Sequence, residues 1–251
     1  MAMAQRSESE TPPIGIGLYT VAEAAALLRI RQRNIRRWLA GYRYKAQDGS
    51  ARTMPPLWQP QLPPHEHQIE LGFRDLIELR FVSAFMDKGL GIPTIRRCLE
   101  QARVIIGDER PFSTRRFQTD GRTIFLTSIE QVLANQSEAL AEVSETEHSR
   151  LIDLRDRQFV FRSLIQQTFK DLDVGNDAVT RWRPYRGKTT IVLDPKRAFG
   201  QPIANDTGVP TRTLSDAVAA EGSEKRVAAL FNVARLVVTD AVAFERELVA
   251  A

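Results

Sequence analysis

The stretch from Arg29 to Arg52 concentrates side chains that bind polyanions. It holds eight cationic residues against a single acid, Asp48, which gives a net charge of +7 over 24 residues. Guanidinium groups bind phosphates and guanine edges, and an asparagine amide matches the edge of adenine. Four side chains of these types lie close together in the sequence: Arg33, Asn34, Arg36 and Arg37. This pattern predicts contacts with double-stranded DNA.

The segment from Gly41 to Arg52 predicts a β-hairpin, a wing beside the arginine-rich segment. Aromatic and basic residues alternate from Tyr42 to Lys45, and Asp48-Gly49 is a favoured turn pair. The cations of this wing are expected on the phosphate backbone of DNA. With Thr20 and Gln32, which start the two helices before it, the wing residues Arg43, Lys45 and Arg52 complete the predicted DNA-contacting set.

Two short helices are expected to position these side chains. Thr20-Val21-Ala22-Glu23 has the form of a capping box and starts the first helix, which breaks at Arg29-Ile30. The second runs from about Gln32 to Ala40, with Ile35, Trp38 and Leu39 toward the core. Two helices joined by a tight turn indicate a helix-turn-helix. The alternative is a surface helix with solvated arginines, but such a face usually mixes charge signs, and no acid occurs between Arg29 and Lys45.

The candidate nucleophile, metal ligands and carboxylates elsewhere in the sequence form no convincing catalytic or metal site. Cys98 is the single cysteine and falls on the apolar stripe of a helix opened by Pro93, so we expect it in the core. His65 and His67 lack a third metal ligand nearby. Asp171, Asp173 and Asp177 follow a helix end and are interpreted as solvated loop acids. We therefore expect no enzymatic activity, no metal and no cofactor.

The whole sequence favours a cytoplasmic protein of two domains. Its 251 residues, 43% hydrophobic and 26% charged, suffice for two cores or three small ones. The start lacks the apolar segment of a signal peptide, and no apolar run approaches the roughly 20 residues of a membrane span. The predicted parts are a disordered tail (1–17), a DNA-binding domain (18–126), a helix or linker (127–150) and a C-terminal domain (151–251).

After the wing the sequence predicts a helix from Phe73 to Lys88, a hairpin and a further helix. Phe117 to Phe125 is interpreted as a hairpin that turns at Asp120-Gly121. Ser128-x-x-Gln131 is then expected to cap a helix that either pairs two chains or packs within one. The apolar residues assigned to this dimerisation helix are Ile129, Val132, Leu133, Leu140 and Val143.

Three motifs of the N-terminal half resemble the DNA-binding domain of MerR-type regulators over roughly residues 18 to 106. They are Tyr19-Thr20-Val21-Ala22-Glu23-Ala24-Ala25, Arg33-x-Ile35-Arg36-Arg37-Trp38 and Gly89-Leu90-Gly91-Ile92-Pro93-x-Ile95-Arg96-x-x-Leu99. The resemblance implies a winged helix-turn-helix and a homodimer, paired through the helix that follows the domain. The wing here is longer and proline-rich, and the cysteines of the metal sensors are lacking, which argues against metal sensing.

The C-terminal half predicts a helix, a hairpin and a trihelical unit. The helix runs from Phe159 to Leu172 and ends at Gly175-Asn176, and the hairpin joins Val179–Tyr185 to Thr189–Leu193. Three helices follow Pro210. The inner positions assigned to them are Leu214, Val218, Val227, Leu230, Phe231, Val237, Ala241, Phe244 and Leu248. The predicted fold class is therefore mainly α with small β-hairpins.

The order of glycine and proline residues in this half resembles the antitoxin-associated domain of unknown function 433 over about residues 189 to 247. The matching segments are Leu193-Asp194-Pro195, Phe199-Gly200-Gln201-Pro202, Gly208-Val209-Pro210-Thr211-x-x-Leu214, Glu221-Gly222-Ser223 and Val227-Ala228-x-Leu230-Phe231. One departure is Asp206-Thr207-Gly208, where short members have Gly-Thr-Arg. The resemblance implies a VapB-like antitoxin that pairs with a PIN-like ribonuclease toxin.

Three functions follow from these features. The first is the antitoxin of a type II toxin–antitoxin system, which binds operator DNA, represses its own operon and neutralises a PIN-like ribonuclease. The second is a MerR-like transcription factor whose C-terminal domain senses a ligand or a protein, and the third is an enzyme.

A cation cluster with two aromatic anchors is the predicted toxin contact, although it could equally be a solvated hairpin edge or a second DNA contact. Its members are Arg181, Trp182, Arg183, Tyr185, Arg186 and Lys188.

Overall fold

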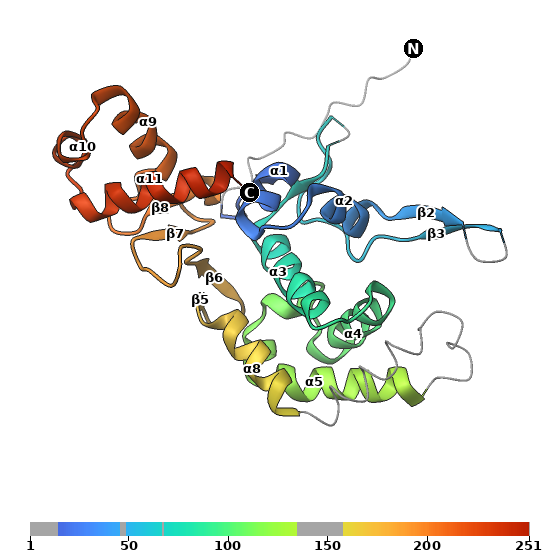
Figure 1. Ribbon diagram of the computed structural model, residues 1–251. Coiled ribbons are helices and arrows are strands. Elements are labelled where there is room, and N and C mark those ends of the chain that lie inside the picture. The colour runs from blue at the N-terminus through green and yellow to red at the C-terminus, as the bar shows by residue number, and fades with distance from the viewer. Residues whose placement is uncertain (1–14, 46–48, 67, 135–157, 251) are drawn as a thin grey trace, which may run out of the picture.

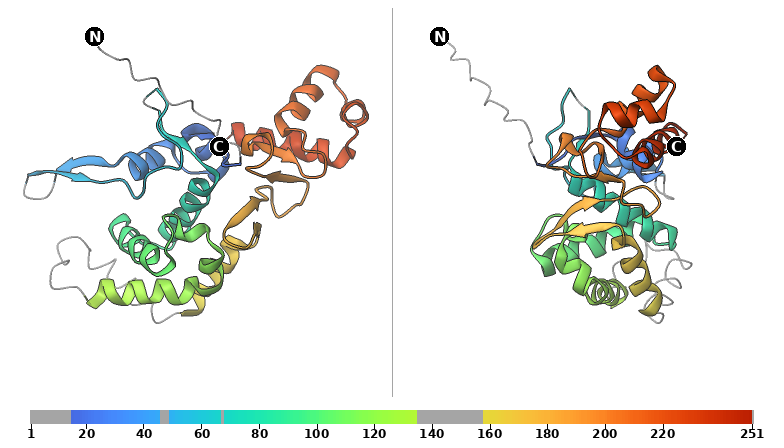
Figure 2. Two further views of the ribbon diagram at one scale, coloured as in Figure 1. Left: turned by 180° about the vertical axis from the view of Figure 1, so that it is seen from behind. Right: turned by 90° about the vertical axis from the view of Figure 1, so that its left-hand side faces the viewer.

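The structure is a computed structural model that describes residues 15–45, 49–66, 68–134 and 158–250. Within these ranges it is mainly helical with small antiparallel sheets, which confirms the predicted fold class. A central helix, α3 (Phe73–Asp87), separates two projecting parts. Figures 1 and 2 show the wing on one side of α3 and the C-terminal trihelical unit on the other.

The N-terminal elements follow the prediction closely. They are β1 (Tyr19–Thr20), α1 (Val21–Leu28), α2 (Gln32–Ala40), β2 (Tyr42–Lys45), β3 (Ala51–Met54) and β4 (Glu70–Leu71). Strand β1 pairs antiparallel with β4, which ties the start of α1 to the start of α3. Strands β2 and β3 form the wing. The predicted helix-turn-helix and hairpin are therefore both confirmed as structures.

Aromatic packing joins α3 to the helices and the turn that follow it. These helices are α4 (Ile92–Ile106), α5 (Arg115–Ala134) and α8 (Gln158–Phe169), with the 3-10 turn η1 (Pro111–Ser113) between α4 and α5. The centre of the Phe81 ring on α3 lies 5.0 Å from the centre of the Phe169 ring and 5.9 Å from that of Phe112. Cys98 is buried on α4, as predicted. One core therefore runs continuously from α1 to the first strands of the C-terminal half.

The hairpin predicted at Phe117–Phe125 is wrong, because this segment lies within α5. Phe117, Gly121, Ile124 and Phe125 recur at helical spacing and are buried on one face. A Cβ on Gly121 would lie 3.1 Å from the Phe117 ring and 3.2 Å from Ile165, so the glycine permits close packing of α5 on α8. It does not make a turn.

The start predicted for a helix at Ser128 is wrong, because this residue lies inside α5, which begins at Arg115. Ile129, Val132 and Leu133 belong to this helix, but their side chains fall outside the described structure. Leu140 and Val143 lie outside the described residues altogether. The predicted pairing of two chains through these residues stays a prediction.

The C-terminal half starts with a four-stranded antiparallel sheet in the order β5–β6–β7–β8. Its strands are β5 (Leu172–Val174), β6 (Val179–Trp182), β7 (Ile191–Leu193) and β8 (Pro202–Ala204). The predicted hairpin is confirmed as β6–β7, in which Trp182 faces Leu193. The helix predicted to reach Leu172 ends at Phe169, because residues 172–174 pair with β6 as β5.

The predicted trihelical unit is confirmed as α9 (Thr211–Glu221), α10 (Glu224–Leu230) and α11 (Arg235–Val249). Leu214, Val227, Val238 and Ala241 form its small core. The prediction that Leu230 faces inward is wrong, because its side chain is 70% exposed.

The two halves meet along β1, α1 and α11. The hydroxyl of buried Tyr19 donates to the carbonyl of Gly200 at 2.7 Å, and the amide of Leu18 donates to the carbonyl of Phe199 at 2.9 Å. Arg29, in the turn after α1, forms a 2.8 Å ion pair with Glu247 on α11. The helix-turn-helix is thus held directly against the C-terminal half.

Stability should depend on pH through Glu78 on α3. Burial raises the pKa of its carboxyl to about 8, although hydrogen bonds from Ser113 and Phe112 and the nearby Arg74 oppose this. The folded chain therefore retains a proton that the unfolded chain releases above its ordinary pKa of 4.5. Between these two values the free energy of unfolding should fall by about 1.4 kcal/mol per pH unit.

Urea unfolding at several pH values from 5 to 9 tests this dependence. Glu78→Gln cannot titrate, so its free energy of unfolding should fall less steeply with pH than that of the wild type. Equal slopes in the two chains would rule out Glu78 as the titrating group.

Candidate nucleic-acid interface

Helix α1 begins with the predicted capping box. The Thr20 hydroxyl oxygen accepts from the Glu23 amide at 3.2 Å, and the Glu23 carboxylate accepts from the Thr20 amide at 2.8 Å. The helix ends at Arg29, whose φ of 57° lies in the left-handed region and reverses the chain into α2. Thr20 is exposed, so its predicted contact with DNA is sterically open and stays a prediction.

Helix α2 separates a buried apolar face from an exposed basic one. Ile35, Trp38 and Leu39 are buried, as predicted, whereas Gln32 and the arginines are exposed and Asn34 is half-buried. In the described parts of the chain Arg33 and Arg36 have no ion-pair partner. Their guanidinium groups are therefore available to an anionic ligand.

The wing has two different faces. Tyr44 lies opposite Arg52 and Arg43 opposite Thr53 in the β2–β3 register, and neighbouring pairs point to opposite sides. Arg52 thus shares a face with Tyr44, while Arg43 and Lys45 project from the other. The alternation of the strand could have indicated this division from the sequence. The predicted Asp48 of the turn lies outside the described residues.

A stacked arginine connects the wing to α2. The guanidinium of Arg37 lies 3.8 Å from the centre of the Tyr42 ring, and Tyr42 in turn contacts Tyr44 at 5.9 Å between ring centres. Such a contact leaves the N–H groups at the guanidinium edge free to donate. The aromatic residues of the wing therefore orient an arginine of α2.

The base of the wing is fixed by contacts that the sequence did not predict. Gly41 has φ 72°, and a Cβ there would lie 2.3 Å from the Met54 carbonyl oxygen, so only glycine fits. Arg96 on α4 donates to the carbonyls of Pro55 at 2.6 Å and Pro56 at 2.7 Å. The proline-rich exit of the wing is thereby held against α4.

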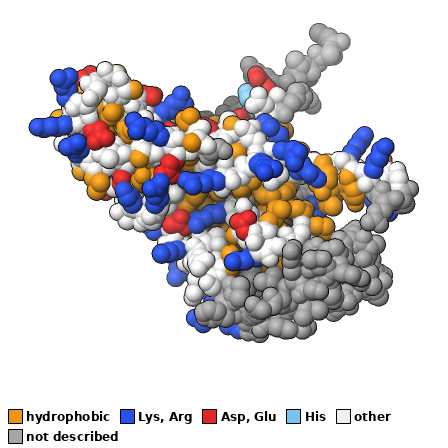
Figure 3. All heavy atoms as spheres, in the orientation of Figure 1, with side chains coloured by type: hydrophobic (Ala, Val, Ile, Leu, Met, Phe, Trp, Pro, Cys, Tyr) orange, Lys and Arg blue, Asp and Glu red, His pale blue; other side chains and the backbone are white. Residues whose placement is uncertain are grey.

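Basic side chains gather on the surface that α2 and the wing share. Figure 3 shows Lys and Arg side chains over these elements, separated by apolar side chains. An exposed helix with several arginines beside a basic hairpin matches the way winged helix-turn-helix domains meet the major groove and the phosphate backbone.

Residues 17–99 match the model of a protein family described as "Putative DNA-binding HTH domain". This range includes α1, α2, the wing, α3 and the first half of α4. The chain carries an N-terminal helix-turn-helix domain. The domain thus contains the predicted DNA-contacting residues, although the match assigns no role to any of them.

The similarity to known proteins extends beyond this domain. A protein of Mycobacterium tuberculosis (strain ATCC 25618 / H37Rv) named "Putative antitoxin VapB45" is 24% identical over 196 residues, which are 77% of this chain and 79% of that protein. The crystal structure of Rv2018 from Mycobacterium tuberculosis superposes with a TM-score of 0.66 at 22% identity, over 91% of this chain and 99% of that one. The fold of nearly the whole chain is therefore shared with a solved structure.

The residues predicted to contact a toxin are placed within the C-terminal half. Trp182 and Tyr185 are each only 5% exposed, and the Trp182 ring nitrogen donates to Asp171 at 3.0 Å. A toxin contact through these rings would require them to leave their own core. The prediction of aromatic anchors at this site is thus not supported by where the rings lie.

The cations of this predicted set have partners inside the chain. Arg181 and Arg183 pair with Asp173 at 3.1 and 2.6 Å. Arg186 pairs with Glu247, and Lys188 pairs with buried Asp240 at 2.5 Å. Asp173 is therefore an ion-pair partner, and Asp171 likewise pairs with Arg80 at 2.6 Å, rather than both being solvated loop acids as predicted.

Two further findings concern metals and membranes. In residues 15–45, 49–66, 68–134 and 158–250, no group of three or more His, Cys, Asp or Glu side chains is placed to hold a metal ion. No single helix of these ranges is long and apolar enough to cross a membrane; α10 and α11 reach that length and apolarity only together, with a bend of 115° between them.

Proposed function

We propose that this protein is the DNA-binding antitoxin of a type II toxin–antitoxin pair and represses its own operon from the cytoplasm. The observation that carries the DNA-binding part is the exposed arginine face of α2, which lies beside a basic wing and has no ion pairs for Arg33 and Arg36 within the described structure. The antitoxin part is supported by the similarity of 77% of the chain to a VapB-type protein.

In the proposed complex α2 lies in the major groove of operator DNA. Arg33, Arg36 and Arg37 would reach guanine edges and Asn34 an adenine edge. Arg43, Lys45 and Arg52 of the wing would contact phosphates. Thr20 and Gln32 complete the predicted DNA-contacting set. Because the wing cations project from two faces, the two faces would contact different phosphates or one of them would face solvent.

A homodimer is part of this proposal. Two copies of α2 related by a twofold axis would read an inverted repeat whose half-site spacing equals the distance between the two helices. The pairing surface would be the apolar residues assigned to the dimerisation helix, of which Ile129, Val132 and Leu133 lie at the end of α5. The toxin would be a PIN-like ribonuclease.

Titration with DNA and with the neighbouring gene product tests the proposal. The full chain should bind a duplex from upstream of its own gene, and because phosphate contacts release counterions, affinity should fall by about 10³-fold or more between roughly 50 and 200 mM salt. It should also co-purify with the ribonuclease-type product of the adjacent reading frame and inhibit its cleavage of RNA. Failure to bind the duplex, or no inhibition, would overturn the corresponding part.

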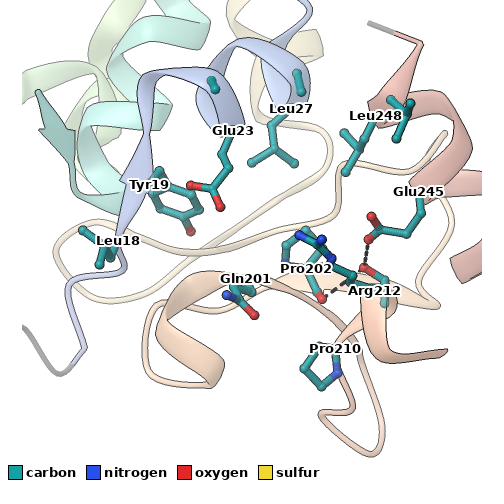
Figure 4. A pocket seen from close by; sticks show the side chains of 14 residues that line it. Leu18, Tyr19, Glu23, Leu27, Gln201, Pro202, Pro210, Arg212, Glu245 and Leu248 are labelled. Carbon is teal, nitrogen blue, oxygen red and sulfur yellow. Dashed lines mark hydrogen bonds between the residues drawn. The ribbon is translucent and has the colours of Figure 1, made fainter. Parts of the chain in front are cut away.

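The second candidate function is a transcription factor that responds to a ligand. It is favoured by a pocket of about 320 Å³ between the two halves (Figure 4). Its apolar lining includes Ala26 and Leu27 on α1 and Leu248 on α11, and Glu23 and Glu245 also line it. This volume and place at a domain junction suit a small molecule. A neighbouring gene that encodes no ribonuclease would favour this candidate.

A further inference from the structure

The trihelical unit repeats the geometry of the N-terminal helix-turn-helix at a constant offset of 203 residues. Helices α1 and α10 start at positions 21 and 224, and α2 and α11 start at positions 32 and 235. The N-cap side chains are Thr20 and Ser223, each of which accepts an amide three residues on. Between the helices, Arg29 and Asn232 have φ of 57° and 52°.

Most of the buried positions of the two motifs match as well, although buried Val21 corresponds to half-buried Glu224 and exposed Arg37 to buried Asp240. The matching positions of the first motif are Ala24, Ala25, Ile30, Ile35, Trp38 and Leu39. The same offset gives Val227, Ala228, Val233, Val238, Ala241 and Val242, all buried except the half-buried Val233. The bond from the Ile30 amide to the Ala25 carbonyl, 3.1 Å, recurs from Val233 to Ala228 at 3.0 Å. Helix α11 therefore follows α10 through the same kind of turn that joins the expected recognition helix α2 to α1.

The exposed chemistry of the two motifs differs. The positions of Arg33, Arg36 and Arg37 are taken in α11 by Leu236, Thr239 and Asp240. Asp240 is buried against Lys188, and the Thr239 hydroxyl donates to Glu224 at 2.7 Å. No guanidinium occupies these three positions, so this recognition helix lacks the groups with which α2 would bind bases.

Two leucines flank the turn of the second motif. Leu230 is 70% exposed at the end of α10, and Leu236 is 61% exposed in the first turn of α11. The counterpart of Leu230 in the first motif is Leu27, which packs against the Tyr185 and Phe244 cluster of the C-terminal half. In this chain, then, a protein surface already covers the equivalent position of the first motif, whereas Leu230 is left open.

Three cations lie near the two leucines in the sequence, on the same two helices. Lys225 and Arg226 are exposed on α10 and Arg235 at the start of α11; Arg226 lies 3.9 Å from Glu221, and Arg235 lies 3.6 Å from Glu224. Three cations against two acids leave a slight positive excess. Pairing with a second copy about a twofold axis would bring like charges together, which disfavours self-association.

We propose that this second helix-turn-helix is a docking surface for the toxin, with Leu230 and Leu236 at its centre and Lys225, Arg226 and Arg235 at its rim. The proposal rests on the proposed antitoxin function. It requires a toxin face with an apolar centre and acidic side chains around it, since interface centres are apolar and rims are charged.

The test replaces both leucines in the full-length protein. Leu230→Glu/Leu236→Glu is titrated by calorimetry against the purified product of the adjacent ribonuclease-type reading frame, and separately against duplex DNA from upstream of its own gene. We expect toxin affinity to fall by about 100-fold or more, as for two central contacts, while DNA affinity changes less than about twofold. Leu230→Ala/Leu236→Ala, which adds no charge, should weaken toxin binding in the same direction.

The matched control is Met86→Glu/Val104→Glu, which adds two glutamates at exposed apolar positions on α3 and α4. It should bind the toxin as the wild type does, and thermal unfolding should show all variants folded. Undiminished toxin binding by both leucine variants would overturn the proposal, as would loss of DNA binding alone or a smaller oligomer with toxin binding intact. If the wild type binds the duplex but not the toxin, the toxin part of the proposed function fails, and this inference fails with it.

Discussion

Replacing Arg33 and Arg36 together by alanine should abolish specific binding of operator DNA while leaving the fold unchanged. Both side chains are exposed on α2 and have no ion pairs within the described structure, so their removal leaves no buried charge unpaired. Each good contact with a base discriminates by about 1–3 kcal/mol, so affinity should fall roughly 30-fold to 10⁴-fold. Fluorescence anisotropy with the operator duplex and with a scrambled duplex measures this loss.

Arg212→Ala/Arg226→Ala is the matched control for this experiment. It also removes two exposed arginines, one on α9 and one on α10, but away from α2 and the wing. The control should keep its preference for the operator over the scrambled duplex. If both double variants lose the same affinity, net charge rather than α2 accounts for the binding. Arg37→Ala is less informative, because it also removes the stacking on Tyr42.

The N-terminal motif could be predicted almost to the residue because its signals are local. The capping box fixes the start of α1, and the apolar spacing of Ile35, Trp38 and Leu39 fixes the buried face of α2. The match of α10 and α11 to these two helices was not predicted, although three helices after Pro210 were. Only the structure shows that Arg29 and Asn232 share a backbone conformation that non-glycine residues rarely adopt.

The error at α5 has a tertiary cause. Asp120-Gly121 has the local preference of a hairpin turn, but Gly121 is buried where α5 meets Ile165 on α8. A partner more than 40 residues away therefore decides the conformation, which no local pattern could indicate. The same limitation applies to β5, whose three residues continue an apparent helical pattern and are recruited by pairing with β6.

The candidate site was predictable in its residues but not in its arrangement. Sequence spacing identified the cations of α2 and the wing, and their exposure agrees with that choice. It could not show that Arg37 stacks on Tyr42, because that contact joins two elements across a turn. In the C-terminal half, composition alone indicated a free basic cluster, whereas Asp173 and Asp240 in fact neutralise part of it.

Asp75→Ala should lower the free energy of unfolding by about 3–5 kcal/mol, as expected when one partner of a buried ion pair is removed. Asp75 is fully buried on α3, and one carboxylate oxygen accepts from Arg110 at 2.6 Å and from the Trp58 ring nitrogen at 3.0 Å. The other accepts from the amides of Gln61 and Gly72 at 2.7 and 2.9 Å. Alanine would leave all four donors without this acceptor. Urea unfolding measures the loss.

Two variants bracket this result and connect it to DNA binding. Asp75→Asn keeps one acceptor oxygen and should lose less stability than alanine, whereas Asp216→Ala, at a largely exposed acid, should leave the unfolding midpoint unchanged.

The Asp75 network holds the chain between the wing and α3, and the Leu57 amide just before Trp58 donates to the Trp38 carbonyl on α2 at 2.7 Å. Folded Asp75→Asn should therefore also bind operator DNA more weakly, because the wing is less firmly positioned against α2. Wild-type stability of Asp75→Ala would contradict the structural role of this network.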